Sequence, residues 1–472
     1  MSFCQILDPT QKALQINLTD SIYGSFAEIG AGQEVVRHFF RAGGAAGTIA
    51  KTISAYDMTV SDTVYGKGGR YVSSERLQKM LDREFEQLKD RLTDVRSSNT
   101  RYFNFANTVS AKSYKGGSEC HGWLGVKFEH TPGAQPSNLI VHIQMLDREN
   151  VQQQEAVGDM GVNLIHACFF NREDPKNFVR SLMDSLTTDR LQIDMIKVDG
   201  PAFAHMDNRL LSLDLVKNGY CRAIMFNQSG EVDQIKDQIY KKNLLVVRGS
   251  FRPPTLVNLD MLKAGHTQFN KSLNAKEQGN VLELAEMSMN QLLERGEVHG
   301  RDFLARVDLL AALNQSVLIS NYENFYELNQ FLSVATRDHK IGFVTGVYNL
   351  LEIFDHEKYL ENPGMILEGL GKLFGTKSKL LVYPAADDND PDRLLNSEQI
   401  DIHENFHFLM KYLKENHFIE DVTDYDPSIS GIWSRVVLDM IQTGKKGWES
   451  MVPKVVAQKV VEKSLFGHKE KK

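Results

Sequence analysis

The residues that follow the apolar run NLLVV at 243–247 are of types that can hold phosphate. Arg248 and Arg252 enclose the pair Gly249-Ser250. A guanidinium binds phosphate oxygens through two parallel hydrogen bonds, and a glycine lets the backbone come close to an anion. We therefore expect a phosphate-binding turn at this point of the chain, and the alternative is a strand end stopped by proline with arginines at the surface.

Polar residues follow other apolar runs as well. Asp199 follows LQIDMIKV, Asn227 follows YCRAIMF, and Thr255 lies just beyond the two arginines. In an open parallel sheet, ligands bind in the crevice outside the carboxyl ends of the strands. The sequence thus predicts one edge that carries a ligand, with Asp199 available to a ribose hydroxyl or a metal ion and magnesium expected beside a nucleotide. The expected ligand-binding residues are Asp199, Asn227, Arg248, Gly249, Ser250, Arg252 and Thr255.

The segment His403-Glu404-Asn405-Phe406-His407 has the pattern H-E-x-x-H. On a helix this spacing sets two imidazoles one turn apart, with the glutamate placed as a general base on zinc-bound water. A third ligand is missing at the metzincin spacing, where Leu413 stands. We interpret the motif as a solvated helix face and keep a zinc-dependent hydrolase as an alternative.

Cys120 and His121 stand side by side before Trp123, in a segment whose composition predicts a loop. A nucleophilic cysteine needs a base close in space. The sequence alone names no such base, so we interpret the pair as incidental.

Short apolar strands alternate with helices between residues 148 and 390, which is typical of a parallel sheet covered by helices on both faces. The predicted fold class is therefore α/β, and residues 148–390 are its doubly wound core. The predicted strands of this core are 191–198, 220–226, 243–248, 316–319, 341–344 and 379–383, and a longer helical insertion covers 276–313.

Two further regions flank this core. Residues 1–147 read as a mixed α+β region, with a periodic helix at 74–96 and strands at 101–109, 122–128 and 138–145. Residues 391–472 read as a helical segment with a basic tail. We interpret the tail, Lys454–Lys472, as a docking helix, and peripheral contact with a membrane surface is the alternative.

Composition excludes several classes of protein. The chain has 472 residues, of which 42% are hydrophobic and 24% charged, which is ordinary for a globular protein. A net charge of −7 gives no overall attraction to nucleic acid. We expect neither a secretory signal nor a transmembrane segment, because no suitable apolar run occurs. The cytoplasm is the expected location.

The segment from Gly249 to Asn258 resembles the adenylyltransferase signature strand–G-[ST]-F-x-P-x-H-x-G-H–helix of nicotinate-nucleotide adenylyltransferases. Thr255 and Asn258 stand where that signature has its two histidines, and Val257 replaces the glycine between them. In that family the histidines neutralise phosphate charge in the transition state. The matching residues are Gly249, Ser250, Phe251 and Pro253.

The whole chain resembles an uncharacterised bacterial family through landmarks that include AGGAAGTIAKTISAYDM, ECHGWLGVKF and VVRGSFRPPTLVNLDML. Members of that family carry two labels, nicotinate-nucleotide adenylyltransferase and TonB-dependent receptor. The receptor label conflicts with the expected absence of a signal peptide.

These observations predict a protein that binds a nucleotide or another small anionic phosphate metabolite, with an adenylyltransferase-like activity as the sharpest version. A non-catalytic scaffold or assembly protein and the zinc-dependent hydrolase are the alternatives.

Overall fold

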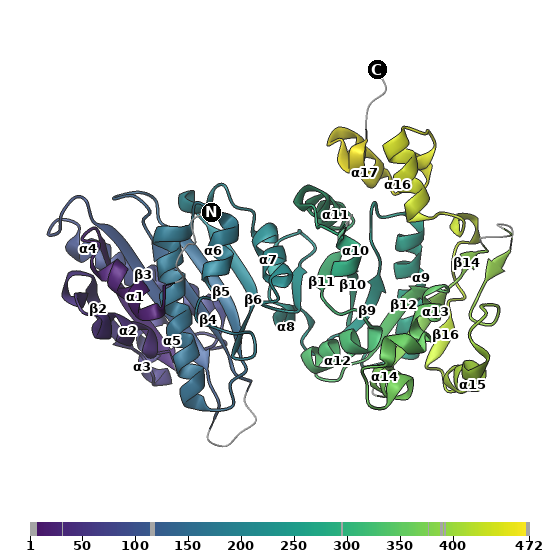
Figure 1. The fold of residues 1–472 in the computed structure, drawn as a ribbon, viewed down its shortest axis with the longest axis horizontal. Helices are drawn as coiled ribbons and strands as arrows, with labels where there is room; N and C mark the ends of the chain where they lie inside the picture. The colour runs from purple at the N-terminus through teal and green to yellow at the C-terminus, as the bar shows by residue number, and fades with distance from the viewer. Residues whose placement is uncertain are drawn as a thin grey trace. The chain divides into compact units, whose positions relative to one another are not determined.

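The computed structural model describes residues 7–30, 32–113, 119–293, 296–375, 377–387, 390 and 393–468. The chain divides into two compact units, Met1–Cys221 and Arg222–Lys472, here called unit 1 and unit 2. Each unit is built around its own β-sheet with helices on both faces (Figure 1). The predicted α/β fold class is confirmed.

Unit 1 contains a mixed six-stranded sheet in the order β2-β1-β3-β4-β5-β6. The strands β2, β1 and β3 run parallel, and β3 to β6 are antiparallel neighbours. The predicted strand at 191–198 forms here, beside β5, and not in the core sheet to which we assigned it. The strands of the unit 1 sheet are β1 (Ile22–Gly30), β2 (Ile49–Ser54), β3 (Arg101–Ser110), β4 (His121–Phe128), β5 (Ser137–Met145) and β6 (Leu191–Asp199).

Helices cover both faces of this sheet. A side chain at Gly125 of β4 would meet Leu81 of α4, whereas a side chain at Gly161 of α5 would meet Phe105 of β3. Because Phe105 and Gly125 point to opposite faces in the β3–β4 register, α4 and α5 lie on opposite sides. The helices are α1 (Pro9–Asn17), α2 (Glu34–Ala42), α3 (Met58–Tyr65), α4 (Ser74–Leu92), α5 (Asn150–His166), α6 (Pro175–Ser181) and α7 (Asn208–Lys217).

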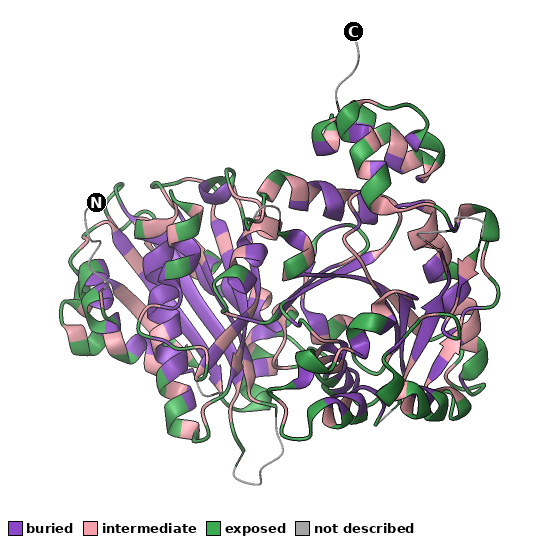
Figure 2. Cartoon of the chain, turned by 45° about the vertical axis from the view of Figure 1, so that its right-hand side comes forward, coloured by how far each residue is buried: buried purple, intermediate pink, exposed green. Residues whose placement is uncertain are grey.

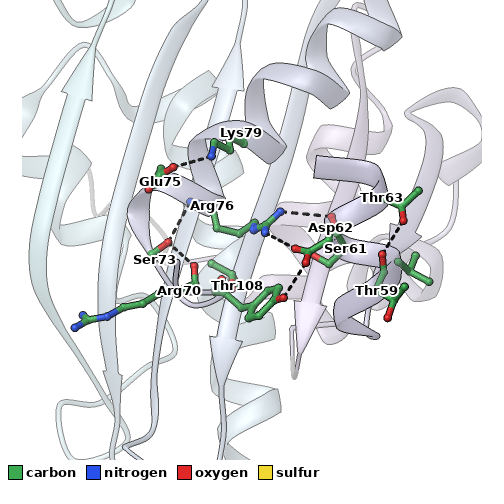
Figure 3. Close-up of polar contacts among 12 residues, drawn as sticks. Thr59, Ser61, Asp62, Thr63, Arg70, Ser73, Glu75, Arg76, Lys79 and Thr108 are labelled. Carbon is green, nitrogen blue, oxygen red and sulfur yellow. Dashed lines mark hydrogen bonds and ion pairs between the residues drawn. The ribbon is translucent and has the colours of Figure 1, made fainter. Parts of the chain in front are cut away.

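A buried ion pair fixes the segment between α3 and α4 (Figure 3). Arg76 of α4, with 1% of its side chain exposed, lies 3.1 Å from Asp62 of α3. The hydroxyl of Tyr71 donates to the same carboxylate at 3.1 Å, and Thr108 of β3 donates to the Tyr71 carbonyl oxygen at 2.6 Å. The connection is thereby attached to the sheet.

Unit 1 also buries a carboxyl group at the end of β1. Glu28 is 1% exposed, and its burial raises the pKa to about 8, against a weaker lowering by the Val36 backbone N–H at the start of α2. This carboxyl is therefore protonated through most of the neutral range.

Unit 2 contains an eight-stranded sheet in the order β16-β13-β12-β9-β10-β11-β7-β8. The six strands from β16 to β11 are parallel, whereas β7 is antiparallel to β11 and β8 is antiparallel to β7. The strands are β7 (Ala223–Phe226), β8 (Val232–Asp233), β9 (Asn243–Arg248), β10 (Val281–Ser288), β11 (Ser316–Ser320), β12 (Ile341–Gly346), β13 (Ser378–Tyr383) and β16 (Ile419–Asp421), and β14 (Ala385–Ala386) pairs separately with β15 (Leu394–Leu395).

Helix α9 lies on one face of this sheet, where Val344 of β12 meets Gly265 of the helix. On the other face Phe343 of β12 packs with Leu328 of α12 and Leu370 of α14 in one apolar cluster, which is part of the buried interior coloured in Figure 2. The helices are α8 (Ile235–Ile239), α9 (Leu256–Ser272), α10 (Met289–Leu292), α11 (Gly300–Ala312), α12 (Phe325–Thr336), α13 (Asn349–Ile353), α14 (Met365–Phe374), α15 (His407–Glu415), α16 (Ser434–Thr443) and α17 (Lys454–Glu462).

The C-terminal segment supplies helices, the short strand β15 and the edge strand β16, which pairs with β13. On α17, Val456 and Val460 are buried against Trp448 and against Leu309 of α11. The apolar side of the tail is thus packed inside unit 2, as a docking helix requires, and residues 469–472 lie outside the described part. Within the described residues no helix is both long and apolar enough to span a membrane.

Two sequence-based assignments differ from the structure. The predicted helical insertion at 276–313 contains strand β10, which pairs with β9 and β11 in the centre of the sheet. The predicted core at 148–390 contributes strands to both sheets. The predicted domain limits at 147/148 and 390/391 stay a prediction, while the contacts within the chain divide it after Cys221.

Candidate functional site

The strand order of unit 2 changes direction at β9, in the centre of its parallel strands. From β9 the chain proceeds to β10 and β11 on one side, and then returns to β12 and β13 on the other. Such a switch in strand order is where open α/β sheets bind ligands. The predicted turn Arg248–Arg252 follows β9 directly, so the structure places it at this switch point.

Arg248 does not extend from this edge, because its guanidinium is bound inside the protein. Nε and Nη2 donate to Glu286 of β10 at 2.6 and 3.2 Å, and further bonds reach the carbonyl oxygens of Tyr322 and Glu323. Ser320 of β11 donates to Glu286 at 2.6 Å. Only 8% of the Arg248 side chain and none of the Glu286 side chain is exposed. This arginine neutralises a buried carboxylate, as a charge in the interior requires.

Thr255 and Asn258 cap the first turn of α9. The Asn258 carboxamide oxygen accepts the Thr255 N–H at 2.9 Å, and the Thr255 hydroxyl accepts the Asn258 N–H. The next N–H, that of Leu256, donates to the carbonyl oxygen of Met451 at 3.0 Å. Thr255 and Asn258, which stand at the two histidine positions of the signature, therefore bond the polar groups at the N-terminus of α9. This end of the helix does not present an anion site.

Gly249 and Ser250 are likewise held by protein groups. The Gly249 N–H donates to the Glu286 carbonyl oxygen, and the Ser250 carbonyl oxygen accepts from Arg306 of α11. A Cβ at Gly249 would lie 3.3 Å from the ring of Phe251, which is 1% exposed. The glycine thus makes room for a buried phenylalanine.

Asp199 and Asn227 do not join this edge, so the expectation of one shared edge is wrong for both. Asp199 ends β6 in unit 1, where it accepts from Asn138 at 2.9 Å. Asn227 directly follows β7, and because β7 is antiparallel to β11, it lies at the opposite edge of the unit 2 sheet. There its carboxamide closes a turn by accepting from Ser229 and Glu231.

Of the predicted residues, Arg252 lines a described cavity. This cavity has a volume of about 560 Å³ and lies at the N-terminal end of α11. Gln442 of α16 and the segment 463–467 after α17 complete its wall. Its lining residues are Arg252, His299, Gly300, Arg301, Asp302, Ala305, Gln442, Lys463, Ser464, Leu465, Phe466 and Gly467.

The charged groups of this cavity are predominantly cationic. Arg252, Arg301 and Lys463 line it together with one carboxylate, that of Asp302. Asp302 accepts from Arg252 Nε at 2.6 Å and also pairs with the buried Arg306 behind it. Asp302 therefore fixes the Arg252 guanidinium at the wall, and Lys463 lies 3.3 Å from Asp308, which is outside the lining. With Arg306 and Asp308 counted as well, the charge of the group is still positive.

The first turn of α11 adds to this field. His299 is its N-cap residue and makes no hydrogen bond from its side chain to the helix. The N-terminal N–H groups of a helix carry a partial positive charge that attracts anions. Neither Arg301 nor Lys463 was predicted from the sequence, in which the local signal is the basic, glycine-containing start His299-Gly300-Arg301 of a helical pattern.

The pattern at His403–His407 does not form a metal site. His403 precedes a short 3₁₀-helix and accepts the Asn405 N–H, whereas His407 begins α15 and donates to the Ile402 carbonyl oxygen at 3.0 Å. The two imidazoles are therefore not one turn apart on one helix. Among the described residues no group of three or more His, Cys, Asp or Glu side chains could hold a metal ion. This corrects the zinc-hydrolase alternative.

Comparisons with known proteins found solved structures of low similarity to this chain. No family model and no curated protein matches the chain. A competence/damage inducible protein, CihA, from Agrobacterium tumefaciens is 16% identical over 35% of this chain and 98% of its own, with a TM-score of 0.26. The nicotinic acid mononucleotide adenylyltransferase of Plasmodium falciparum, complexed with APC, is 12% identical over 49% of this chain and 100% of its own, with a TM-score of 0.31.

A putative nicotinate-nucleotide adenylyltransferase from Vibrio parahaemolyticus is 14% identical over 48% of this chain and 97% of its own, with a TM-score of 0.20. At these scores the likenesses carry no argument about what this chain does. The receptor label finds no support in them.

Proposed function

We propose that unit 2 binds a small phosphate-bearing metabolite of nucleotide size in the cavity beside Arg252. The observation that carries this proposal is a cavity of about 560 Å³ whose lining has three cationic side chains and one carboxylate. That volume is within the range of about 300–1,000 Å³ typical of small-molecule sites.

The arrangement suits phosphate for two reasons. The Arg301 guanidinium can donate two parallel hydrogen bonds to phosphate oxygens, and Arg252, whose Nε is bound to Asp302, adds positive charge to the same wall. The start of α11 supplies backbone N–H groups on the same wall. A neutral ligand of equal size would gain from neither feature, so we expect an anion to bind in preference.

The proposal concerns binding and assigns no group-transfer step. Thr255 and Asn258 are bound to each other at the end of α9, so they offer no substitute for the histidine pair of the adenylyltransferase signature. Arg248, which we expected to hold phosphate, neutralises Glu286. The expected ligand class is retained, while its binding residues shift to Arg252, Arg301 and Lys463.

A ligand screen tests this proposal. We expect inorganic pyrophosphate, AMP, ATP or a pyridine mononucleotide to raise the thermal midpoint, because a ligand at 100 times its dissociation constant adds about 2.7 kcal/mol of stability. Each nucleotide is tested with and without magnesium, since phosphate oxygens coordinate that ion themselves. If no probe stabilises the wild-type protein, the proposal is wrong.

A matched pair of charge reversals assigns the site. Arg301→Glu places a carboxylate on the cavity wall and should weaken binding at least about tenfold, the value of one charged hydrogen bond. Lys446→Glu makes the same change of charge at an exposed position of unit 2 outside the lining and should leave the affinity unchanged. Equal affinities of both variants and the wild type would place the ligand elsewhere.

A further inference from the structure

Two cationic side chains of the cavity beside Arg252 are neutralised less by the protein than Arg252 itself. Arg301, in the first turn of α11, is exposed, and the described residues include no hydrogen-bond or ion-pair partner of its guanidinium. Lys463 Nζ lies 3.3 Å from Asp308, with 51% and 33% of the two side chains exposed. Because exposed ion pairs contribute little, both cations stay available to a ligand.

The charged groups at this cavity have a net charge of plus two. The lining supplies three cationic side chains and one carboxylate. One further cation is paired with that carboxylate, and one further carboxylate is paired with Lys463. Four positive and two negative groups therefore leave two positive charges in excess. The six groups are Arg252, Arg301, Arg306, Lys463, Asp302 and Asp308.

Phosphate groups differ in charge according to the number of ester bonds that they carry. A phosphate monoester loses its second proton near pH 6 and carries about two negative charges at pH 8. A phosphodiester carries one, as each phosphate of a nucleic acid backbone does. Two negative charges balance the excess at this cavity, whereas one negative charge leaves part of it unbalanced. A monoester also offers three terminal oxygens to the donors of the wall.

We propose that the ligand of this cavity is a phosphate monoester, such as a nucleoside monophosphate or a sugar phosphate, and that Arg301 and Lys463 select it over a phosphodiester. This inference rests on the proposed function and narrows it to one class of phosphate. Arg301 donates two parallel N–H groups to two terminal oxygens. Lys463 adds a point charge from the C-terminal segment.

Three adenosine compounds separate the charge of the ligand from its shape. Adenosine 5′-sulfate has the shape of AMP but carries one negative charge, and cyclic 3′,5′-AMP is a phosphodiester. Their dissociation constants are measured by titration calorimetry on the full chain at pH 8, in low salt and with EDTA, because salt and metal ions screen charge. We expect AMP to bind at least about tenfold more tightly than either of the other two, the value of one charged hydrogen bond.

A graded series at Arg301 tests whether the excess charge causes this preference. Arg301→Gln lowers the excess to one positive charge and Arg301→Glu removes it. The preference for AMP over adenosine 5′-sulfate should therefore fall in the first variant and disappear in the second. Lys411→Gln and Lys411→Glu make matched changes at an exposed position of α15 outside the lining, and they should keep the preference. Since each preference is a ratio of two affinities within one variant, a general loss of stability does not imitate this result.

The outcomes separate this inference from the proposed function. Equal affinities of the wild-type protein for AMP and adenosine 5′-sulfate, or tighter binding of the cyclic diester, would refute selection of a monoester and leave phosphate binding in place. Binding of ATP or pyrophosphate without binding of AMP would have the same meaning. An unchanged preference in Arg301→Glu would contradict the role of Arg301. If no phosphate compound bound at all, both the inference and the proposed function would be wrong.

Discussion

Removal of Arg248 should destabilise unit 2 far more than removal of an exposed charge. In Arg248→Met the Glu286 carboxylate, which has no exposed surface, keeps only the hydrogen bond from Ser320. Breaking a buried ion pair by deleting one partner costs about 3–5 kcal/mol, which corresponds to an unfolding equilibrium shifted about 150- to 5,000-fold. The loss of two carbonyl contacts and of the Phe325 ring contact acts in the same direction.

Urea unfolding measured by fluorescence tests this value. With Trp123 replaced by phenylalanine, both remaining tryptophans, Trp433 and Trp448, lie in unit 2 and report its unfolding. The control is Lys445→Met, which removes an exposed pair with Asp439 and should cost less than about 1 kcal/mol.

A double replacement completes the test. Arg248→Met combined with Glu286→Leu removes both charges, and an apolar pair of similar volume is often as stable as a buried ion pair. The double variant should therefore be more stable than Arg248→Met alone. If Arg248→Met costs no more than Lys445→Met, the Arg248–Glu286 pair is not the structural element described above.

Two further predictions concern single side chains. Between pH 4.5 and about 8 the folded protein keeps Glu28 protonated, whereas the unfolded chain ionises it. The contribution of Glu28 to the free energy of unfolding should therefore fall by about 1.4 kcal/mol per pH unit as pH rises. Glu28→Gln should remove this contribution and flatten the slope measured in urea titrations. Thr255→Ala removes the cap of α9 and should cost about 1 kcal/mol, whereas Thr267→Ala within the same helix should be neutral or slightly stabilising; equal midpoints in thermal unfolding would contradict the capping role.

Local patterns were sufficient to predict elements whose signals lie within a few residues. A helix at 74–96 was predicted from its apolar period, and the structure has it at Ser74–Leu92 with Ser73 as its N-cap. Strand β10 was assigned to a helix because Leu, Glu, Ala and Met are good helix formers. Its strand conformation comes from its place between β9 and β11, which no local pattern records.

The candidate site was predicted only in part, because some of its features depend on residues that are distant in sequence. The turn after β9 was placed correctly at an edge of a parallel sheet, because strand and turn are adjacent in sequence. The direction of β7 and the sheet to which β6 belongs depend on distant partners, so Asn227 and Asp199 were misplaced. Arg252 meets Arg301 and Lys463 only through the packing of α11 and the C-terminal segment.

The reciprocal cap of α9 also bears on how this chain can change over evolutionary time. Thr255 and Asn258 occupy both histidine positions of the adenylyltransferase signature, and each depends on the other for its hydrogen bond. A first mutation to histidine at either position breaks the cap and lowers stability by about 1 kcal/mol before a second histidine is present. A sequence that carries only one of the two histidines would therefore be less stable than the present one.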